Sequence, residues 1–265
     1  DHFDEIREHF SVANKAAKFA RFRGRFIPPR SYAITPAGRF EPGLYDEIQK
    51  FCVERQYSEK LILTENFTNE ASPGYNLKEI PELKLKLREY QDNIVRSCLN
   101  KGRGTVVLAT AGGKTLTIAT LLESIYTADK NVTCALIVPD LGLVTQTYND
   151  FVDYGVNFTF SKWTGTHELD ISSNVIICNL GILQSSKSNV EWLKDIDVCV
   201  VDEVHKLRKG NKVNKLLKQI RTPRRFGFTG TMPEEHVDQW NIIGKIGPII
   251  YERNMNYERI IMYLM

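Results

Sequence analysis

The chain has 265 residues and a nearly balanced charge, with 35 Lys and Arg against 32 Asp and Glu and a net charge of +3. Such a length holds one large α/β domain and a smaller unit, and this net charge alone gives no argument for nucleic-acid binding. No apolar run reaches transmembrane length, and no signal-like segment opens the chain. The five cysteines lack disulfide or metal spacing, so we expect buried thiols and a cytoplasmic location.

The first 64 residues predict a small α+β unit. We expect a helix at 3–10, basic strands after it, a helix at 44–55 and a short strand at 61–63. The next stretch, 65–82, contains Asn, Ser, Pro and Gly and is typical of a linker.

Basic and aromatic residues alternate near the N-terminus. Between Ser11 and Phe40 there is no Asp or Glu, whereas seven Lys and Arg fall there. Arg21, Arg23 and Arg25 would share one face of a strand, because side chains alternate between the two faces. Three guanidinium groups on one face suit the phosphate backbone of DNA. A solvated strand face is the alternative.

From residue 83 onward, apolar strands alternate with helices. This rhythm predicts an α/β fold in which a parallel sheet carries helices on both faces. The expected strands lie at 105–108, 133–138, 157–160, 174–177, 198–201 and 225–228, and the expected helices at 90–99, 116–126, 143–154 and 213–220.

A glycine-rich turn with a lysine stands between the first of these strands and its helix. Backbone N–H groups of such a turn, together with the positive end of the helix, bind phosphates. Lys114 would reach the β- and γ-phosphates of ATP, and the Thr115 hydroxyl would hold Mg²⁺. Leu108 occupies a position that usually holds Gly or Ala, so a glycine loop with an incidental lysine is the alternative. The residues expected to bind the nucleotide here are Thr110, Ala111, Gly112, Gly113, Lys114 and Thr115.

Two acidic residues follow the strand expected at 198–201. The carboxyl ends of parallel strands lie at the edge where open α/β sheets bind ligands, which would bring Asp202 and Glu203 near the phosphate loop. We expect Asp202 to hold Mg²⁺ and Glu203 to orient or deprotonate the attacking water. His205 would sense the γ-phosphate. The alternative is a solvated helix start, where acidic residues are favoured.

These motifs, in this order, resemble the first RecA-like lobe of superfamily 2 helicases and translocases of the DExH type. The resemblance covers about residues 85–252 and includes Leu-Arg-Glu-Tyr-Gln at 87–91 and Phe-Thr-Gly-Thr at 228–231. The stretch 246–252 resembles the close of this lobe in the XPB-like branch. The resemblance implies an ATP hydrolase in which Gln91 recognises adenine, while Thr229 and Thr231 couple hydrolysis to movement. Gly230 departs from the alanine that is usual in that motif.

The same resemblance implies a set of residues that face the DNA backbone. They come from segments similar to motif Ia, motif Ib and the strand that follows, and some of them have packing or capping as the alternative role. These residues are Pro139, Gln146, Thr164, Gly165 and Asn179.

Short segments near the N-terminus resemble the accessory domain of UvsW-type phage DNA helicases. They lie at 3–11, 23–25, 38–44 and 48–52. The resemblance implies an ATP-dependent helicase or branch-migrating translocase that acts on branched DNA in recombination, repair or replication, in the host cytoplasm. We therefore expect a basic accessory DNA-binding domain at 1–64, a linker at 65–82, the ATP-binding lobe at 83–252 and the start of a further linker at 253–265.

In this superfamily ATP lies between two RecA-like lobes. We therefore expect a second lobe in the same parent chain, and poor hydrolysis by this part alone, because an arginine finger supplies ~10³–10⁵ in rate. Two other interpretations stay open: the motor subunit of a restriction or remodelling complex, and a nucleotide-gated DNA-binding scaffold with a dormant ATPase. Backbone contacts serve both nucleic acids and no motif here reads a 2′-hydroxyl, so the motor motifs leave DNA and RNA open. The UvsW-like segments favour DNA.

Replacing Arg21, Arg23 and Arg25 together with Ala should weaken DNA binding. With fewer phosphate contacts, binding releases fewer counterions from the DNA, so the dependence of affinity on salt should flatten. Fluorescence anisotropy with labelled DNA over a salt series measures both effects. An unchanged salt slope would assign the three arginines to a solvated surface.

Overall fold

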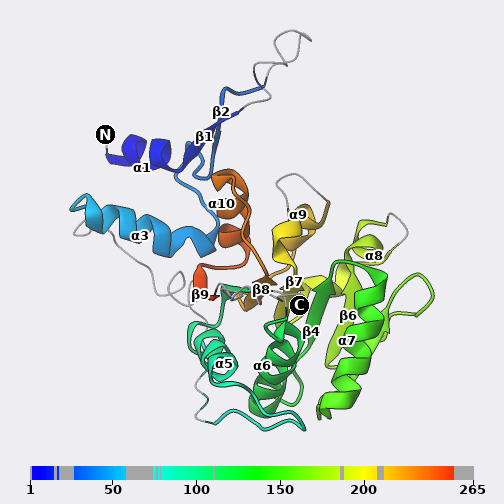
Figure 1. The fold of residues 1–265 in the computed structure, drawn as a ribbon. Helices are drawn as coiled ribbons and strands as arrows, with labels where there is room; N and C mark the ends of the chain where they lie inside the picture. The colour runs from blue at the N-terminus through cyan, green and yellow to red at the C-terminus, as the bar shows by residue number, and fades with distance from the viewer. Residues whose placement is uncertain are drawn as a thin grey trace, which may run out of the picture.

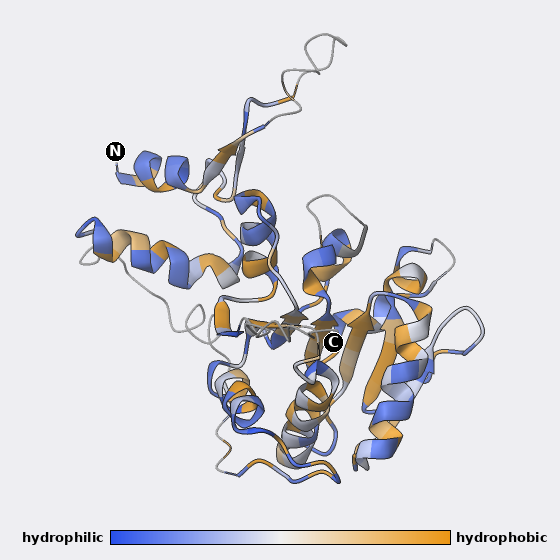
Figure 2. Cartoon of the chain, viewed as in Figure 1, coloured by the Kyte–Doolittle hydropathy of each residue, from blue (hydrophilic) through white to orange (hydrophobic). Residues whose placement is uncertain are grey.

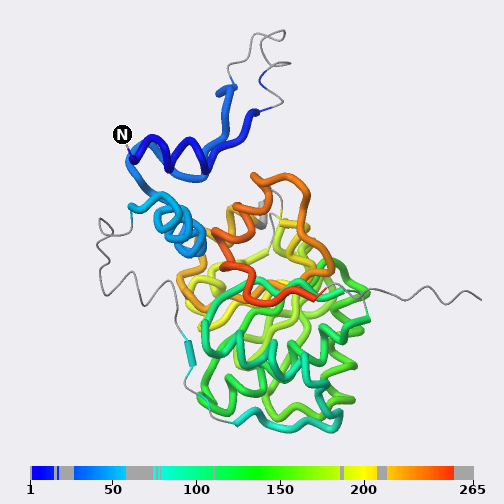
Figure 3. Tube along the Cα trace, turned by 60° about the vertical axis from the view of Figure 1, so that its left-hand side comes forward, coloured from blue at the N-terminus to red at the C-terminus, as the bar shows by residue number. Residues whose placement is uncertain are grey.

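The computed structural model describes residues 2–14, 17, 27–57, 74–75, 77, 79–109, 111–185, 188–207 and 212–253. A large sheet domain carries a smaller N-terminal unit on one side (Figure 1). Figure 3, turned by 60°, shows the same division, with the N-terminal unit projecting from the sheet domain.

The large sheet has seven strands, and each neighbouring pair is parallel. Parallel pairing requires a crossover between strands, which explains the alternation of strands and helices along the chain. In spatial order the strands are β5 (Phe160–Trp163), β6 (Val175–Asn179), β4 (Cys134–Val138), β7 (Val198–Asp202), β8 (Arg225–Thr229), β3 (Gly104–Leu108) and β9 (Ile249–Arg253).

Helices cover both faces of this sheet (Figure 1). The orange interior and bluer outer surfaces in Figure 2 follow from this arrangement. In β4, Leu136 packs into the core on one face, whereas Ala135 and Ile137 pack into the core on the other. One core takes side chains from α5 (Glu89–Lys101), α6 (Lys114–Ala128) and α7 (Leu141–Tyr154); the other takes them from α8 (Leu180–Gln184), η3 (Glu191–Lys194), η4 (Val204–Lys206), α9 (Lys212–Leu217) and α10 (His236–Lys245). The predicted parallel sheet with helices on both faces is confirmed.

Strand β5 begins at Phe160, whereas the sequence pattern placed a strand at 157–160. The backbone N–H and side-chain amide of Asn157 both donate to the Glu123 carboxylate, each at 2.8 Å. Asn157 is therefore tied to α6, and pairing with β6 starts only at Phe160 opposite Val175. Helix α10 and edge strand β9 were not among the predicted elements.

Within its described residues, the N-terminal unit has the helical elements α1, η1 and α3 and a short antiparallel pair of strands. Its core contains Phe10, Leu44, Ile48 and Phe51, and it also includes Ile243 from α10. The predicted strands at 21–25 and 61–63 lie outside the described residues. The elements are α1 (His2–His9), β1 (Ser11–Ala13), β2 (Arg30–Tyr32), η1 (Pro42–Leu44) and α3 (Tyr45–Glu54).

Close backbone contact joins this unit to α10. A Cβ atom added at Gly43 would lie 1.9 Å from the carbonyl oxygen of Ile243, and one added at Gly244 would lie 2.9 Å from Cβ of Glu41. Only glycine fits such a separation. The two glycines therefore set how closely η1 and α10 approach.

All five cysteines are free and buried, as expected from their spacing. Burial raises the pKa of the Cys199 thiol to about 12. Across the described residues, no helix combines the length and the apolar character needed to cross a bilayer.

Replacing Gly43 with Ala should destabilise the N-terminal unit by about 1–3 kcal/mol, because the added methyl overlaps the Ile243 carbonyl. Thermal unfolding and limited proteolysis measure the effect. Gly165→Ala is the matched control, since a Cβ there meets no atom within 4 Å. Equal melting temperatures for the two variants would contradict the tight contact.

Candidate nucleotide-binding site

Three neighbouring strands bring the predicted catalytic motifs to one edge of the sheet. Strand β3 pairs with β8, with Val107 opposite Thr229, and β8 pairs with β7, with Phe228 opposite Asp202. All three run in the same direction, so the loops after their carboxyl ends are adjacent. This edge is where open α/β sheets bind ligands.

The glycine-rich loop between β3 and α6 depends on its two glycines. Gly113 has φ +74°, and a Cβ there would lie 2.4 Å from Nε2 of Gln91. A Cβ at Gly112 would lie 2.6 Å from Cγ of Leu108. Leu108, the departure from the usual loop pattern, is fully buried and occupies the space that the missing Cβ leaves. The loop thus accommodates leucine because residue 112 is glycine.

The Gln91 side chain supports the glycine-rich loop through hydrogen bonds. Its side-chain Nε2 donates to the carbonyl oxygens of Gly112 and Gly113, both at 3.2 Å. Its side-chain Oε1 accepts the backbone N–H of Arg88 at 2.8 Å. The residue is only 3% exposed. This supporting role was not predicted from the sequence, which marked Gln91 only as an adenine contact.

Lys114 and Glu203 form a direct ion pair across the site. Their side chains are 13% and 23% exposed, so solvent screens the pair far less than it screens a surface pair. Glu203 adopts a left-handed backbone conformation with φ +52°, which is uncommon for a residue with a side chain. The turn after β7 thus aims this carboxylate at the phosphate loop.

The acidic motif is connected to the strand end of β8 through a histidine. His205 Nδ1 lies 3.2 Å from Oε2 of Glu203 and 2.8 Å from Oγ1 of Thr229. The Thr229 hydroxyl donates to the carbonyl of Thr231 at 2.8 Å, so its oxygen is an acceptor for a hydrogen on Nδ1. A continuous polar chain therefore runs from Lys114 through Glu203, His205 and Thr229 to Thr231.

Asp202 lies beside this chain. Burial raises the pKa of its carboxyl, Lys114 opposes that rise, and Glu203 adds to it. The carboxylate also accepts the backbone N–H of Glu203 at 2.9 Å. A carboxylate held in a desolvated position next to a cation is typical of a functional site.

The residues at this edge fit a nucleotide and Mg²⁺. The loop has two glycines at which a Cβ would overlap Leu108 or Gln91, a lysine at the start of a 15-residue helix, and hard oxygen donors at Thr115 and Asp202. Among the described residues, no group of three His, Cys, Asp or Glu forms a complete metal site. Mg²⁺ in phosphoryl-transfer sites takes one or two protein ligands, and the phosphates and water supply the rest.

The residues expected to face DNA lie along the neighbouring part of the same edge. Pro139, Thr164 and Asn179 stand at or just after the ends of β4, β5 and β6. The Asn179 side chain caps α8 by accepting the N–H of Ile182 at 3.2 Å. Thr164 is 5% exposed, so its side chain is buried in the turn that follows β5. Gln146 and Gly165, by contrast, are exposed.

The short turn after β5 depends on His167, for which the sequence predicted no role. The Thr164 hydroxyl lies 2.8 Å from Nδ1 of His167 and accepts the backbone N–H of His167 at 3.2 Å. These bonds present Gly165 at the tip of the turn. Thr110 and the arginines at 21, 23 and 25 lie outside the described residues.

Asp202→Asn should stabilise the fold at neutral pH, by about 0.5–2 kcal/mol. The pKa of Asp202 is raised in the folded protein, so its ionised form opposes folding above that pKa. The stabilisation should therefore shrink as the pH falls toward the ordinary carboxyl range. Chemical denaturation of both proteins across pH 4–8 measures it, and a stabilisation independent of pH would contradict this assignment.

Comparison with known proteins places this geometry in a family. Residues 84–234 match the family described as type III restriction enzyme, res subunit. The ATP-dependent DNA helicase uvsW of Enterobacteria phage T4 is 25% identical over 262 residues, which is 93% of this chain and 51% of that protein. The DNA 3'-5' translocase XPB2 of Sulfurisphaera tokodaii is 27% identical over 77% of this chain and 43% of its own length. The chain thus spans about half the length of these curated relatives.

Solved structures share the fold. A crystal structure of the UvsW helicase from bacteriophage T4 has a TM-score of 0.68 at 23% identity and covers 94% of this chain and 93% of that one. The SWI2/SNF2 ATPase core of Sulfolobus solfataricus in complex with dsDNA has a TM-score of 0.56 at 20% identity, over 65% of this chain and 38% of that one. The family match covers more than half of the chain. The chain therefore belongs to the type III restriction enzyme res-subunit family, and its sheet domain is a RecA-like lobe of the superfamily 2 helicase type.

Proposed function

We propose that this chain is the first motor lobe, with an accessory DNA-binding unit, of an ATP-dependent DNA helicase or branch-migrating translocase. Its substrate is branched DNA in recombination, repair or replication. The observation that carries the proposal is the polar chain from Lys114 through Glu203 and His205 to Thr229. A motor must connect hydrolysis to movement, and these polar contacts join the phosphate loop to the segment that leads into α10.

Lys114 binds the β- and γ-phosphates of ATP, while Thr115 and Asp202 hold Mg²⁺. When bound there, the ion would supply positive charge that offsets the negative charge developing during phosphoryl transfer. Gln91 is the proposed adenine contact, and its amide supports the phosphate loop in this structure. Because the side chain is only 3% exposed, contact with adenine would require it to give up part of this support, which would couple base binding to loop geometry.

Glu203 orients and deprotonates the attacking water. In this structure its carboxylate is paired with Lys114. Phosphate oxygens compete for the same ammonium group, and binding of the nucleotide frees the carboxylate to accept a proton. His205 reports this change to Thr229, because it contacts both side chains.

Movement passes from Thr229 and Thr231 into α10, and from α10 into the N-terminal unit that packs on it. The DNA backbone runs along the edge that carries Pro139, Gln146, Thr164, Gly165 and Asn179. Gly165 is exposed on this edge, whereas Thr164 and Asn179 stabilise the turns by accepting backbone N–H groups.

We divide the chain into an accessory domain at 1–64 that includes Arg21, Arg23 and Arg25, a linker at 65–82, the motor lobe at 83–252 and a connection at 253–265. A second RecA-like lobe of the parent chain completes the ATP site. Relatives named a DNA helicase and a DNA translocase support this assignment, and a phage relative supports a location in the host cytoplasm.

The motor subunit of a restriction complex is the second candidate, because the matched family is described by such a subunit. That match begins at residue 84 and leaves out the N-terminal unit. The similarity to the T4 helicase extends over 93% of the chain, so it includes much of that unit. The wider similarity favours the helicase.

Glu203→Gln in the intact protein should lower DNA-stimulated ATP turnover by about 10²–10⁴-fold, because the amide cannot accept the water proton. Turnover is measured with and without a branched DNA. Glu191→Gln is the matched control, since Glu191 is 71% exposed and pairs only with Lys194 among the described residues. Turnover that ignores DNA in the unaltered protein would overturn the motor assignment.

A further inference from the structure

A cavity of about 540 Å³ lies between the N-terminal unit and the sheet domain, away from the nucleotide site. One wall comes from β2 and the segment that leads to η1, and the other comes from α9 and α10. A second cavity of about 340 Å³ continues from it and shares Glu41 and Lys218 with the first. We call the two cavities together the seam.

The seam concentrates positive charge. Arg39, Lys215, Lys218 and Lys245 line the first cavity, and Glu41 is the one carboxylate among its described lining residues. Arg103, Arg221 and Arg225 add three cations in the second cavity. Seven basic residues thus line the seam with one carboxylate, whereas the whole chain has 35 basic against 32 acidic residues. One of the seven, Arg221, is paired with Asp195 at 3.2 Å. A groove of one sign focuses the field on an anionic partner.

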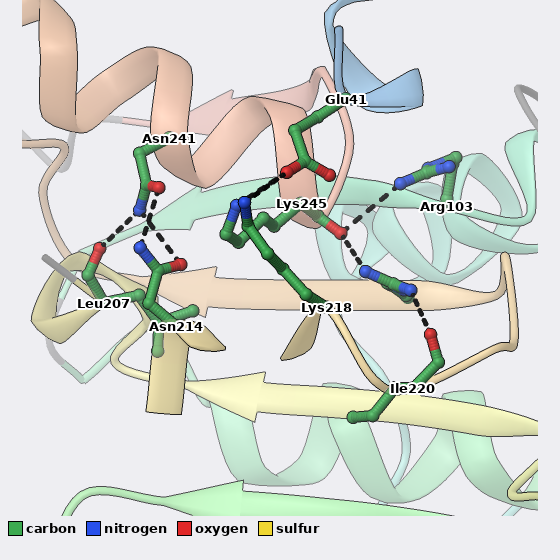
Figure 4. A network of polar contacts seen from close by, with 9 residues as sticks. Glu41, Arg103, Leu207, Asn214, Lys218, Ile220, Asn241 and Lys245 are labelled. Carbon is green, nitrogen blue, oxygen red and sulfur yellow. Dashed lines mark hydrogen bonds and ion pairs between the residues drawn. The ribbon is translucent and has the colours of Figure 1, made fainter. Parts of the chain in front are cut away.

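Glu41 ties the two walls together (Figure 4). Its Oε1 lies 3.0 Å from Nζ of Lys245 and 3.6 Å from Nζ of Lys218. Lys245 is 4% exposed, so its charge requires this carboxylate. Burial lowers the pKa of Lys245, and Glu41 opposes that shift.

Two arginines, the buried Arg103 and the half-buried Arg225, fix the wall formed by the end of α10. Arg225 donates to the carbonyls of Lys245 and Ile220, at 3.0 and 2.7 Å, and Arg103 donates to the carbonyl of Ile246 at 3.0 Å. On the other side of the cavity, Asn241 accepts from Asn214 at 2.8 Å and donates to the carbonyl of Leu207 at 3.0 Å (Figure 4). The seam is preformed, which lowers the entropy cost of binding there.

Two cations on opposite walls remain available. The side chains of Arg39 and Lys215 have no ion pair with any described residue, and both residues are exposed. Lys218 is 63% exposed beside them. Aromatic side chains line the same cavity, with Phe40 on the N-terminal wall and Trp240 on α10.

We propose that the seam binds a short segment of single-stranded DNA, with its phosphates on Arg39, Lys215 and Lys218 and a base against Trp240. The inference rests on the proposed function in taking DNA as the partner. Cations that follow a backbone, combined with aromatic rings for the bases, are how proteins hold single strands. A cavity of this volume has the size of a small-ligand pocket and admits one or two nucleotides, not a duplex.

The test replaces Arg39 and Lys215 together with Ala in the intact protein and measures binding of labelled oligo(dT) by anisotropy across a salt series. Loss of two phosphate contacts should weaken binding and reduce the salt slope by about 1.4. Lys86→Ala is the control, since it removes one cation from an exposed position outside the seam. Circular dichroism checks that each variant is folded.

A second readout uses Trp240. Oligo(dT) should quench tryptophan fluorescence in the unaltered protein and quench it less in Trp240→Phe, which keeps an aromatic ring against Phe10. An unchanged salt slope in the double variant, or equal quenching in both proteins, would overturn the proposal. If the double variant lost affinity for duplex DNA alone, that result would overturn the proposal. Binding of polyglutamate at the seam, with no binding of oligo(dT), would overturn it too.

These outcomes are separate from the test of the motor. Absence of DNA-stimulated ATP turnover in the unaltered protein refutes the proposed function, whatever the seam binds. Retained stimulation together with an unchanged oligo(dT) slope in the double variant refutes the seam alone.

Discussion

Parallel pairing of β7, β8 and β3 is the constraint on which the candidate site depends. These strands are buried on both faces, and their common direction brings three separate loops to one edge. The energy for this comes from the two apolar cores, at roughly 25 cal/mol per Å² of apolar surface buried. The polar residues at the edge therefore need not stabilise the fold, and they are free to hold charge in positions that chemistry requires.

Backbone strain and desolvation at this edge cost free energy, which burial of the apolar cores offsets. Glu203 occupies a left-handed conformation, and Asp202 is held where burial raises its pKa. Strain and desolvation of this kind persist only when the surrounding structure over-determines them. Here Asp202 and Glu203 are held in place by the paired end of β7 and by the charge of Lys114. The same arrangement connects Lys114 through Glu203 and His205 to Thr229 at the end of β8.

The N-terminal unit is joined to the sheet domain in a different way. Its apolar core includes Ile243, its η1 turn lies against the α10 backbone at Gly43, and Glu41 pairs with the buried Lys245. Helix α10 follows directly after the segment that contains Thr229 and Thr231. One helix thus connects the edge that carries the candidate nucleotide site with the N-terminal unit, and it also forms a wall of the basic seam.

The sequence by itself determined the parallel sheet, the phosphate loop and the acidic strand end, because each depends on local patterns: apolar runs, glycines before a lysine, and carboxylates after a buried strand. Only the tertiary structure decided features that need a partner distant in the chain. Strand β9 forms because β3 offers an unpaired edge, and β5 starts late because Glu123 holds Asn157. Gln91 supports the loop, Leu108 fits under Gly112, and the seam gathers cations from separate segments. No local pattern contains these contacts, since their energy comes from packing between segments far apart in the chain.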